Sequence, residues 1–289
     1  MKAIIPAAGH GTRFLPVTRV IPKEMLPIGA KPALELIVEE AKSAGADEIV
    51  MVISKGKELI REYFKDDPAI RFVYQLEQKG LGHAVLQARS AVDAGQVLIL
   101  LGDALVAGCN AAKEMTALSA ANGGASVIGL EHVPSERVSR YGIVKLEDGR
   151  VVDMVEKPRP EEAPSDLAIA GRYLLPTKIF DYLQTQTPGK GGEIQLTDAI
   201  KRLIRDSLES NNRTIEQSNN LTNLTNLNNR TIEQSEQSNN LTNLTNLNNR
   251  TIEQSEQSNN LLGYIYPGKR QDIGNPDGYL QALLAMKEG

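Results

Sequence analysis

Residues 3–27 read AIIPAAGHGTRFLPVTRVIPKEMLP, and this stretch decides the fold. The apolar run Ala3–Ala7 predicts the first strand of a buried sheet. It stops at Gly9–Arg13, a loop whose two glycines leave backbone N–H groups free to approach a phosphate. Lys23 follows ten residues after Arg13. Backbone donors and two cations in this order suit one polyphosphate, although the glycines alone also fit an ordinary tight turn.

The loop differs from two common phosphate-binding motifs. It lacks the GKS or GKT of a P-loop, and it is not the G-x-G-x-x-G of a dinucleotide fold. The pattern G-x-G-T-R-x-L-P followed by P-K-E-M-L-P instead resembles the signature of the sugar nucleotidyltransferases, in wording closest to the bacterial UTP–glucose-1-phosphate uridylyltransferases. The resemblance covers most of residues 1–204 and resumes at 261–285.

Composition limits the class of protein and its partners. The chain has 289 residues, 41% of them hydrophobic, so a substantial core is expected. A net charge of −4 argues against a general nucleic-acid binder. Cys109 is the one cysteine, so no internal disulfide forms, and no Cys/His cluster suggests zinc. Met1 leads directly into a core strand and no apolar run reaches the ~18–20 residues of a membrane span, so we expect a cytoplasmic protein with no membrane partner.

Strands alternate with helices through the first hundred residues. Near-continuous apolar strand runs predict a Rossmann-like, mixed but mostly parallel sheet with helices on both faces, and ligands bind such sheets at the carboxyl ends of strands. We predict strands at 3–7, 48–53, 70–75, 96–101, 125–130, 143–146, 151–156, 167–175 and 262–266. We predict helices at 32–44, 57–64, 82–92, 177–184 and 195–205.

Residues 207–260 have a different composition from the rest of the chain. LTNLTNLNNRTIEQSEQSNN occurs at 221–240 and again at 241–260, and 211–220 is a shortened copy. The segment is polar and holds too few apolar residues for an independent core, so we predict a disordered insertion, with a stacked or helical repeat array as the alternative. The catalytic domain is then 1–206, completed by a C-terminal strand and helix in 261–289.

The resemblance implies a fold, a reaction and a set of catalytic residues. The fold is that of the nucleotide-diphospho-sugar transferases, and the reaction is Mg²⁺-dependent transfer of a uridylyl group from UTP to glucose 1-phosphate, giving UDP-glucose and pyrophosphate. Such chemistry depends on positioning and charge neutralisation. In the family, the Arg that matches Arg13 binds the triphosphate tail and the Lys that matches Lys23 binds the reacting phosphates. The predicted catalytic residues are Arg13, Lys23, Asp103 and Lys157, of which Arg13 and Lys23 also fit solvated surface charges.

Two aspartates are the predicted Mg²⁺ ligands. Asp103 follows the apolar strand VLILL, and a carboxylate at that end of a strand suits Mg²⁺ beside a phosphate site. Asp272 lies in KRQDIGN, which resembles the closing D-x-G-N motif of the family, where the Asp joins the first one on the metal. A helix cap for Asp103 and a turn for Asp272 are the alternatives.

The resemblance also assigns the two substrates to different segments. Gln75 offers a side-chain amide to the uracil edge, and Gly80 and Gly82 let the backbone approach the ring, although a plain helix start also explains Gly82. The predicted nucleotide-binding residues are Ala7, Ala8, Gly9, Gly11, Thr12, Arg13, Gln75, Gly80 and Gly82. The predicted sugar-binding residues are Gly142, Glu156, Lys157, Gly171 and Glu193. An exposed Glu156–Lys157 pair and a first-turn helix acid at Glu193 are the alternatives.

Two other functions stay open at this point. One is a thymidylyltransferase or another sugar-1-phosphate nucleotidyltransferase. The other is a non-catalytic sensor or assembly subunit with the same fold, although such a subunit has no need for both metal carboxylates. The expected partners are UTP and glucose 1-phosphate, and a homo-oligomer is left open.

Overall fold

The computed structural model describes residues 1–209 and 261–285. The prediction of disorder for the repeats therefore falls on residues outside the described ranges, from 210 onward. The chain divides into two compact units, Met1–Lys201 with Leu261–Gly289, and Arg202–Asn260. The candidate site lies in the first unit.

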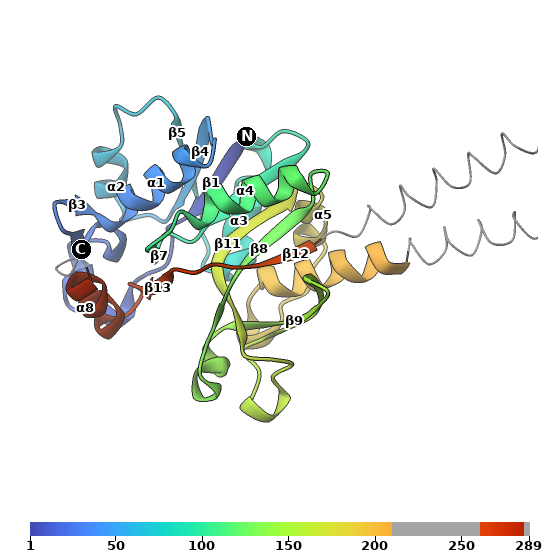
Figure 1. Ribbon diagram of the computed structural model, residues 1–289. Coiled ribbons are helices and arrows are strands. Elements are labelled where there is room, and N and C mark those ends of the chain that lie inside the picture. Colours follow the sequence, from blue (N-terminus) through green and yellow to red (C-terminus); the bar gives the residue numbers. More distant parts are fainter. Residues whose placement is uncertain (210–260, 286–289) are drawn as a thin grey trace, which may run out of the picture. The chain divides into compact units, whose positions relative to one another are not determined.

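Within the described residues, the main sheet has nine strands in the order β5-β4-β1-β6-β11-β8-β12-β10-β9 (Figure 1). In chain order these are β1 (Lys2–Pro6), β4 (Glu48–Ile53), β5 (Ile70–Tyr74), β6 (Gln96–Leu100), β8 (Ser126–His132), β9 (Gly142–Glu147), β10 (Arg150–Glu156), β11 (Leu167–Pro176) and β12 (Leu261–Ile265).

The part of the sheet that carries the glycine loop is parallel. β1 pairs with β4 on one side and β6 on the other, with Ile4 beside Val50 and Ile99. Ala3, Ile4 and Ile5 are all 0% exposed, and successive strand side chains point to opposite faces, so β1 is covered on both. Its carboxyl end therefore delivers the loop after Pro6 to the edge of the sheet.

Helices pack on the sheet in two groups. α1 and α4 contact each other and α4 packs on β8 and β11, whereas α3 packs on β1 and β4 and contacts α5. The helices are α1 (Ala33–Ser43), α2 (Glu58–Tyr63), α3 (Leu81–Gln87), α4 (Ala111–Ala121), α5 (Ile179–Gln184), α8 (Pro276–Ala285) and an unlabelled helix at 196–209. The buried residues of α1 recur at helical spacing and join Ala3 and Ile5 in one core cluster.

A two-stranded ribbon connects the end of β6 with the C-terminal segment. β7 (Ala104–Ala107) pairs antiparallel with β13 (Lys269–Asp272), and Asp272 lies opposite Ala104. Figure 1 shows the red C-terminal segment running from β12 through β13 to α8. The ribbon thereby places residues 104–107 beside residues 269–272, which are far apart in sequence. A second short pair, β2 (Pro27–Ile28) with β3 (Lys31–Pro32), precedes α1.

Most predicted elements are present with small shifts at their ends. The sheet is mixed, as predicted, but parallel pairing is limited to β5–β4–β1–β6 and to β8–β12, so it is not mostly parallel. β11 is antiparallel to both β6 and β8, β9 and β10 are antiparallel, and β12 returns parallel to β8. An apolar run predicts burial of a strand and not its direction, which depends on long-range connections. The helix α4 and the strands β7 and β13 are not predicted from the sequence.

The predicted helix at 195–205 is longer than expected. It covers 196–209 and so includes the first three residues of the predicted insertion. Within the second unit, Arg205 Nε lies 3.9 Å from Glu209 Oε1, a spacing of one helical turn that supports the extension. In residues 1–209 and 261–285, no helix combines the length and apolar character needed to cross a membrane.

Candidate active site

A cavity of about 310 Å³ opens at the carboxyl ends of β1, β5 and β6. Its walls come from the glycine loop, from the turn that carries Lys23, from the segment after β5 and from the end of β6. The lining residues are Pro6, Ala8, Gly9, Lys23, Glu24, Gln75, Gln78, Gly80, Leu81, Ala84, Leu101, Asp103 and Glu193. Seven of the residues predicted from sequence are among them: Ala8, Gly9, Lys23, Gln75, Gly80, Asp103 and Glu193.

Lys23, Asp103 and Asp272 come together at the β7–β13 ribbon. Lys23 Nζ donates to Asp103 Oδ2 across 80 residues of sequence. The Ile273 N–H donates to the Asp103 carbonyl oxygen at 3.0 Å, which fixes the segment that bears Asp272 beside Asp103. A Cβ built on Gly274 would lie 2.9 Å from both Asp103 Oδ2 and Asp272 Oδ1. The two carboxylates therefore border the same small volume.

The charges in this cluster shift one another's pKa values. Burial alone would lower the pKa of Lys23, but the carboxylates of Asp103 and Glu24, with a smaller contribution from Asp272, raise that pKa above 10.5. Burial would likewise raise the pKa of Asp103, but Lys23 and then Lys57 lower it below 3.8. At neutral pH the cluster therefore holds an ammonium group against a carboxylate.

The donor set fits Mg²⁺. Mg²⁺ is usually bound by one or two carboxylates together with phosphate oxygens and water. Asp103 and Asp272 supply two carboxylates beside one volume, and the Lys23 ammonium touches one of them. The described residues hold no group of three or more His, Cys, Asp or Glu side chains suited to a metal, so a site made by protein ligands alone is not found in these ranges.

Gln75 is held with its amide nitrogen occupied. Its Nε2 donates to the Gly80 carbonyl oxygen at 3.1 Å and lies 3.0 Å from His83 Nδ1. Burial, then the charge of Lys79, lowers the pKa of His83, which favours a neutral ring with one accepting nitrogen; the second ring nitrogen, Nε2, lies 3.2 Å from Gln87 Nε2. His83 thus orients Gln75, and the oxygen of the Gln75 amide remains for a ligand that donates a hydrogen bond.

Gly80 and Gly82 have different neighbours at the position that a Cβ would occupy. Gly80 has a φ of 94° and lines the cavity, and a Cβ there would lie 2.6 Å from that of Glu193. A Cβ on Gly82 would lie 2.7 Å from the Ile194 carbonyl oxygen, which already accepts from the Gly82 N–H at 2.8 Å. Gly82 does not line the cavity and its N–H is engaged by Ile194, so its predicted approach to a base remains a prediction.

Three of the predicted sugar residues, Gly142, Glu156 and Lys157, form a second cluster. Glu156 lies opposite Gly142 on paired strands, its Oε2 accepts from Thr197 Oγ1 at 2.6 Å, and its Oε1 lies 3.4 Å from Lys157 Nζ. Glu193 lines the cavity and accepts from Gln195 Nε2 at 3.0 Å. The segment 193–198 therefore connects the cavity with the Glu156 cluster. Neither Gly142, Glu156 nor Lys157 lines the 310 Å³ cavity itself.

Gly171 packs against Leu101 and Ala104, on either side of Asp103. Its φ is 79°, it interrupts the pairing of β11 with β8, and a Cβ would lie 3.0 Å from Leu101 Cδ1 and 3.3 Å from Ala104 Cβ. The next residue, Arg172, is 0% exposed and donates to both carboxylate oxygens of Glu40 and to the Ala104 carbonyl oxygen. This buried network fixes the start of β7, directly after Asp103.

The outer part of the glycine loop carries the remaining predicted residues. Gly11 has a φ of 65° and packs near the Lys23 side chain, with 3.6 Å from a built Cβ to Lys23 Cδ. Thr12 and Arg13 follow on the 3-10 turn Thr12–Phe14 and are both exposed. Ala7 is buried at the start of the loop. Arg13, Thr12, Gly11 and Ala7 do not line the cavity, so their predicted roles remain predictions.

Several residues of the site were missed by the sequence analysis. Glu24 and Gln78 line the cavity, and Gln78 Nε2 donates to the Ala8 carbonyl oxygen at 3.1 Å. Lys57 is buried beneath the loop and pairs with Glu24. Glu24 lies within the motif P-K-E-M-L-P, so that motif could have identified it as a site residue. Lys57 and Gln78 lie in stretches without a distinctive pattern.

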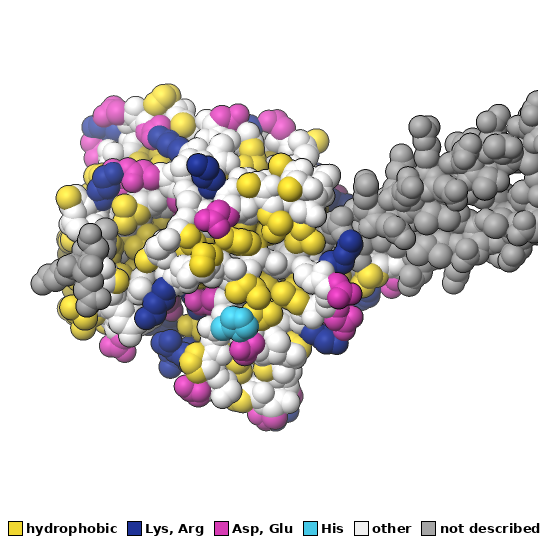
Figure 2. Space-filling model, in the orientation of Figure 1, with side chains coloured by type: hydrophobic (Ala, Val, Ile, Leu, Met, Phe, Trp, Pro, Cys, Tyr) yellow, Lys and Arg dark blue, Asp and Glu magenta, His cyan; other side chains and the backbone are white. Residues whose placement is uncertain are grey.

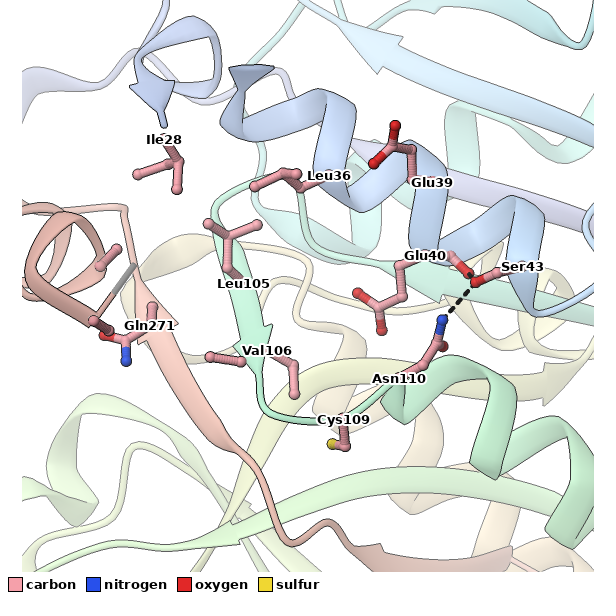
Figure 3. Close-up of a pocket in the computed structure, with 13 residues that line it drawn as sticks. Ile28, Leu36, Glu39, Glu40, Ser43, Leu105, Val106, Cys109, Asn110 and Gln271 are labelled. Atoms are coloured by element: carbon pink, nitrogen blue, oxygen red, sulfur yellow. Dashed lines mark hydrogen bonds between the residues drawn. The ribbon is translucent and has the colours of Figure 1, made fainter. Parts of the chain in front are cut away.

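A second cavity, of about 490 Å³, is lined by α1, the ribbon and α8 (Figure 3). Figure 3 shows Leu36 of α1 near Leu105 of β7, with Glu39 and Glu40 along the helix. Its lining within the described residues includes acids but no lysine or arginine. A triphosphate needs cations, so the 310 Å³ cavity is the better candidate although it is smaller.

The surface charge agrees with a local rather than a global anion site. Figure 2 shows Lys and Arg side chains mixed with Asp and Glu over the face that it draws. With a net charge of −4 for the whole chain, an anionic ligand depends on cations such as Lys23 at the site itself.

Comparison with protein families gives a match over nearly the whole chain. The family described as "Nucleotidyl transferase" matches residues 2–289. Among curated proteins, a UTP–glucose-1-phosphate uridylyltransferase of Staphylococcus haemolyticus is 46% identical over 235 residues, 71% of this chain and 82% of that protein. UTP–glucose-1-phosphate uridylyltransferase 2 of Staphylococcus saprophyticus is 44% identical over 234 residues, 71% of this chain and 81% of that protein.

Solved structures with the same fold include a UDP-glucose pyrophosphorylase complexed with UDP-glucose. It has a TM-score of 0.74 and 32% sequence identity, and the match covers 99% of this chain and 98% of that one. A UTP-bound UGPase from Acinetobacter baumannii matches with a TM-score of 0.69 and 30% identity over 99% of this chain and 92% of that one.

Proposed function

Since the chain belongs to the nucleotidyl transferase family, we propose that it transfers a uridylyl group from UTP to glucose 1-phosphate, giving UDP-glucose and pyrophosphate. The relatives that carry this activity in their names are 44% and 46% identical to it. The observation that carries the proposal is the meeting of Lys23, Asp103 and Asp272 at the β7–β13 ribbon. A non-catalytic sensor has no need for this set.

The reaction is an in-line displacement at phosphorus. A phosphate oxygen of glucose 1-phosphate forms a bond to the α-phosphorus of UTP, and the bond from that phosphorus to the bridging oxygen of the β-phosphate breaks, so that pyrophosphate leaves. Charge accumulates around one phosphorus, and catalysis comes from cations and donors that are already in place. We assign the Lys23 ammonium to the reacting phosphates and the loop at Ala8 and Gly9 to backbone contacts.

Magnesium is part of the proposal. Asp103 and Asp272 would hold the ion, which supplies positive charge to the phosphate oxygens as a Lewis acid. Lys23 donates to Asp103 and so lies within reach of the same phosphates. Arg13, exposed on the turn after the loop, is assigned to the triphosphate tail.

Gln75 accounts for the choice of base. Its amide nitrogen is committed to Gly80 and His83, so its oxygen accepts from the imide N–H of a pyrimidine. Uracil and thymine have that N–H, whereas cytosine has an acceptor at the same ring position. A thymidylyl transfer therefore remains the second candidate, because thymine presents the same edge.

Glu193 and the Glu156 cluster are assigned to glucose. Carboxylates accept paired hydroxyl donors, and the Glu156 carboxylate is oriented by Thr197 and Lys157. Lys157, whose side chain is 42% exposed, is free to turn toward the sugar phosphate. We further propose a cytoplasmic enzyme, with homo-oligomerisation open, in which the 207–260 repeats are an insertion that contributes no catalytic residue.

The test is a substrate panel with the purified full chain and Mg²⁺. UTP, dTTP, CTP and ATP are each combined with glucose 1-phosphate, and UTP is also combined with other sugar 1-phosphates, with release of pyrophosphate as the readout. We expect the highest kcat/KM for UTP with glucose 1-phosphate, dTTP next, and CTP well below both. Absence of turnover with UTP and glucose 1-phosphate would reject the proposal, and preference for dTTP would select the second candidate.

A further inference from the structure

Lys57 is a buried lysine that the chemistry above does not use. It precedes α2, and its side chain is 9% exposed. Its Nζ donates to Glu24 Oε1 at 2.8 Å, to Glu24 Oε2 at 2.7 Å and to the Ala7 carbonyl oxygen at 2.6 Å. The three acceptors match the three protons of the ammonium group.

The two partners of Lys57 belong to the two segments that meet the phosphates. Ala7 is the first residue after β1 and begins the glycine loop, and Glu24 directly follows Lys23 on the 3-10 turn Lys23–Met25. Glu24 lines the 310 Å³ cavity, but Lys57 does not. Lys57 therefore ties the loop to the Lys23 turn from behind the cavity wall, at a place where it contacts no substrate.

We infer that Lys57 is a positioning residue: it fixes the carbonyl group at the start of the glycine loop and holds the Glu24 carboxylate, so that the Lys23 ammonium stays with Asp103 and the phosphates. The inference rests on the proposed function, because it names what orients the groups of that same site. It predicts that loss of Lys57 lowers kcat/KM for UTP and leaves KM for the sugar substrate unchanged.

Glu24 needs such a partner because of where it lies. Its side chain is 2% exposed, and besides Lys57 the charge that acts on it is that of Lys23. Burial raises the pKa of Glu24 and lowers the pKa of Lys57, so removal of one leaves the other in a site that penalises its charge. Without Lys57, the Glu24 carboxylate competes with Asp103 for Lys23.

The experiment compares Lys57→Met, Glu24→Gln and the double variant with wild type. Steady-state turnover is measured at varied UTP and at varied glucose 1-phosphate, and UTP affinity is measured separately by calorimetry. We expect Lys57→Met to lower kcat/KM for UTP by about 100-fold, since small misplacements of reacting groups cost that much, with KM for glucose 1-phosphate unchanged. Lys55→Met, two residues earlier and exposed, is the matched control and should equal wild type.

The double variant separates positioning from direct catalysis. Adding Glu24→Gln to Lys57→Met removes the competing carboxylate, so we expect recovery of about tenfold in kcat/KM for UTP, a coupling typical of contacting residues. Should Lys57→Met fail to fold, the double variant, which buries no unpaired charge, is compared directly with wild type and should remain about tenfold lower for UTP.

Three results would overturn the inference. They are a Lys57→Met enzyme within twofold of wild type, a double variant no better than Lys57→Met, or an equal rise in KM for both substrates. If wild type binds UTP but releases no pyrophosphate from it, the proposed function fails, and the UTP affinities of the variants still decide the role of Lys57.

Discussion

The pair of Lys23 and Asp103 shows how single residues set up the phosphate site. Each is partly shielded from water, and each holds the other in its charged form against the effect of burial. Under the proposed function, Mg²⁺ would be held by the Asp103 carboxylate and the phosphates would be met by the Lys23 ammonium, so each group would exchange one charged partner for another.

Arg13 is the residue whose role is tested most simply. It is exposed on its 3-10 turn, and Arg19, at the end of the next 3-10 turn Val17–Arg19, is similarly exposed. We predict that Arg13→Ala raises KM for UTP by about tenfold, because a charge-assisted contact with the triphosphate tail is lost. Arg19→Ala is the control. Equal KM values for UTP in the two variants would remove Arg13 from the site.

At the scale of elements, the ribbon of β7 and β13 is the part that completes the site. It carries Asp103 at the entrance to one strand and Asp272 at the end of the other, and Arg172 fixes its start. A charged segment such as Lys269–Asp272 forms a strand only because Ala104–Ala107 lies beside it. Strand formation here is a tertiary effect.

The contact of Gly82 with Ile194 supports a prediction about stability. A Cβ at position 82 would meet the Ile194 carbonyl oxygen and Leu183 at 2.7 and 2.8 Å, so α3 or the 193–195 segment must shift. We predict that Gly82→Ala lowers the free energy of unfolding by about 1–3 kcal/mol, measured by urea denaturation. Gly9→Ala, with no atom within 4 Å of the built Cβ, should leave it unchanged or slightly higher. Equal free energies of unfolding for Gly82→Ala and Gly9→Ala would show that α3 or the 193–195 segment shifts without cost, and would contradict this prediction.

The elements that the sequence predicts well are those with strong local patterns. EIVMVI at 48–53 and the run at 96–100 are apolar, bounded by polar residues and glycine, and match β4 and β6. The helix α4, AAKEMTALSAA, is rich in small residues and has a weak amphipathic pattern, so it was missed. The direction of β11 and the pairing of β13 are long-range properties and have no local signal.

For the site, the same division holds between motif residues and supporting residues. Gly9, Lys23, Asp103 and Gln75 lie in or beside recognisable wording and line the cavity as expected. Lys57 and Arg172 act through buried partners, Glu24 and Glu40, that only the folded chain places next to them. Sequence resemblance identifies residues that line the cavity more readily than the buried residues that hold those residues in position.

At the scale of the whole molecule, the candidate site joins distant parts of one chain. The first strand supplies the loop, the turn at 23–25 supplies a cation, the turn between β6 and β7 supplies one acid and the segment after residue 260 supplies the other. The repeat region stands between the third and fourth of these along the sequence. The proposed function therefore depends on the placement of Asp272 beside Asp103 across that interval.

The most direct test is a Mg²⁺ titration of pyrophosphate release from UTP and glucose 1-phosphate by wild type, Asp272→Asn and Asp277→Asn. Asp277 is an exposed acid in the first turn of α8 and serves as the matched control. The account predicts that Asp272→Asn needs at least about tenfold more Mg²⁺ for half-maximal velocity, because one metal ligand is weakened, while Asp277→Asn behaves as wild type. An unchanged Mg²⁺ requirement in Asp272→Asn would contradict the claim that Asp103 and Asp272 hold one ion.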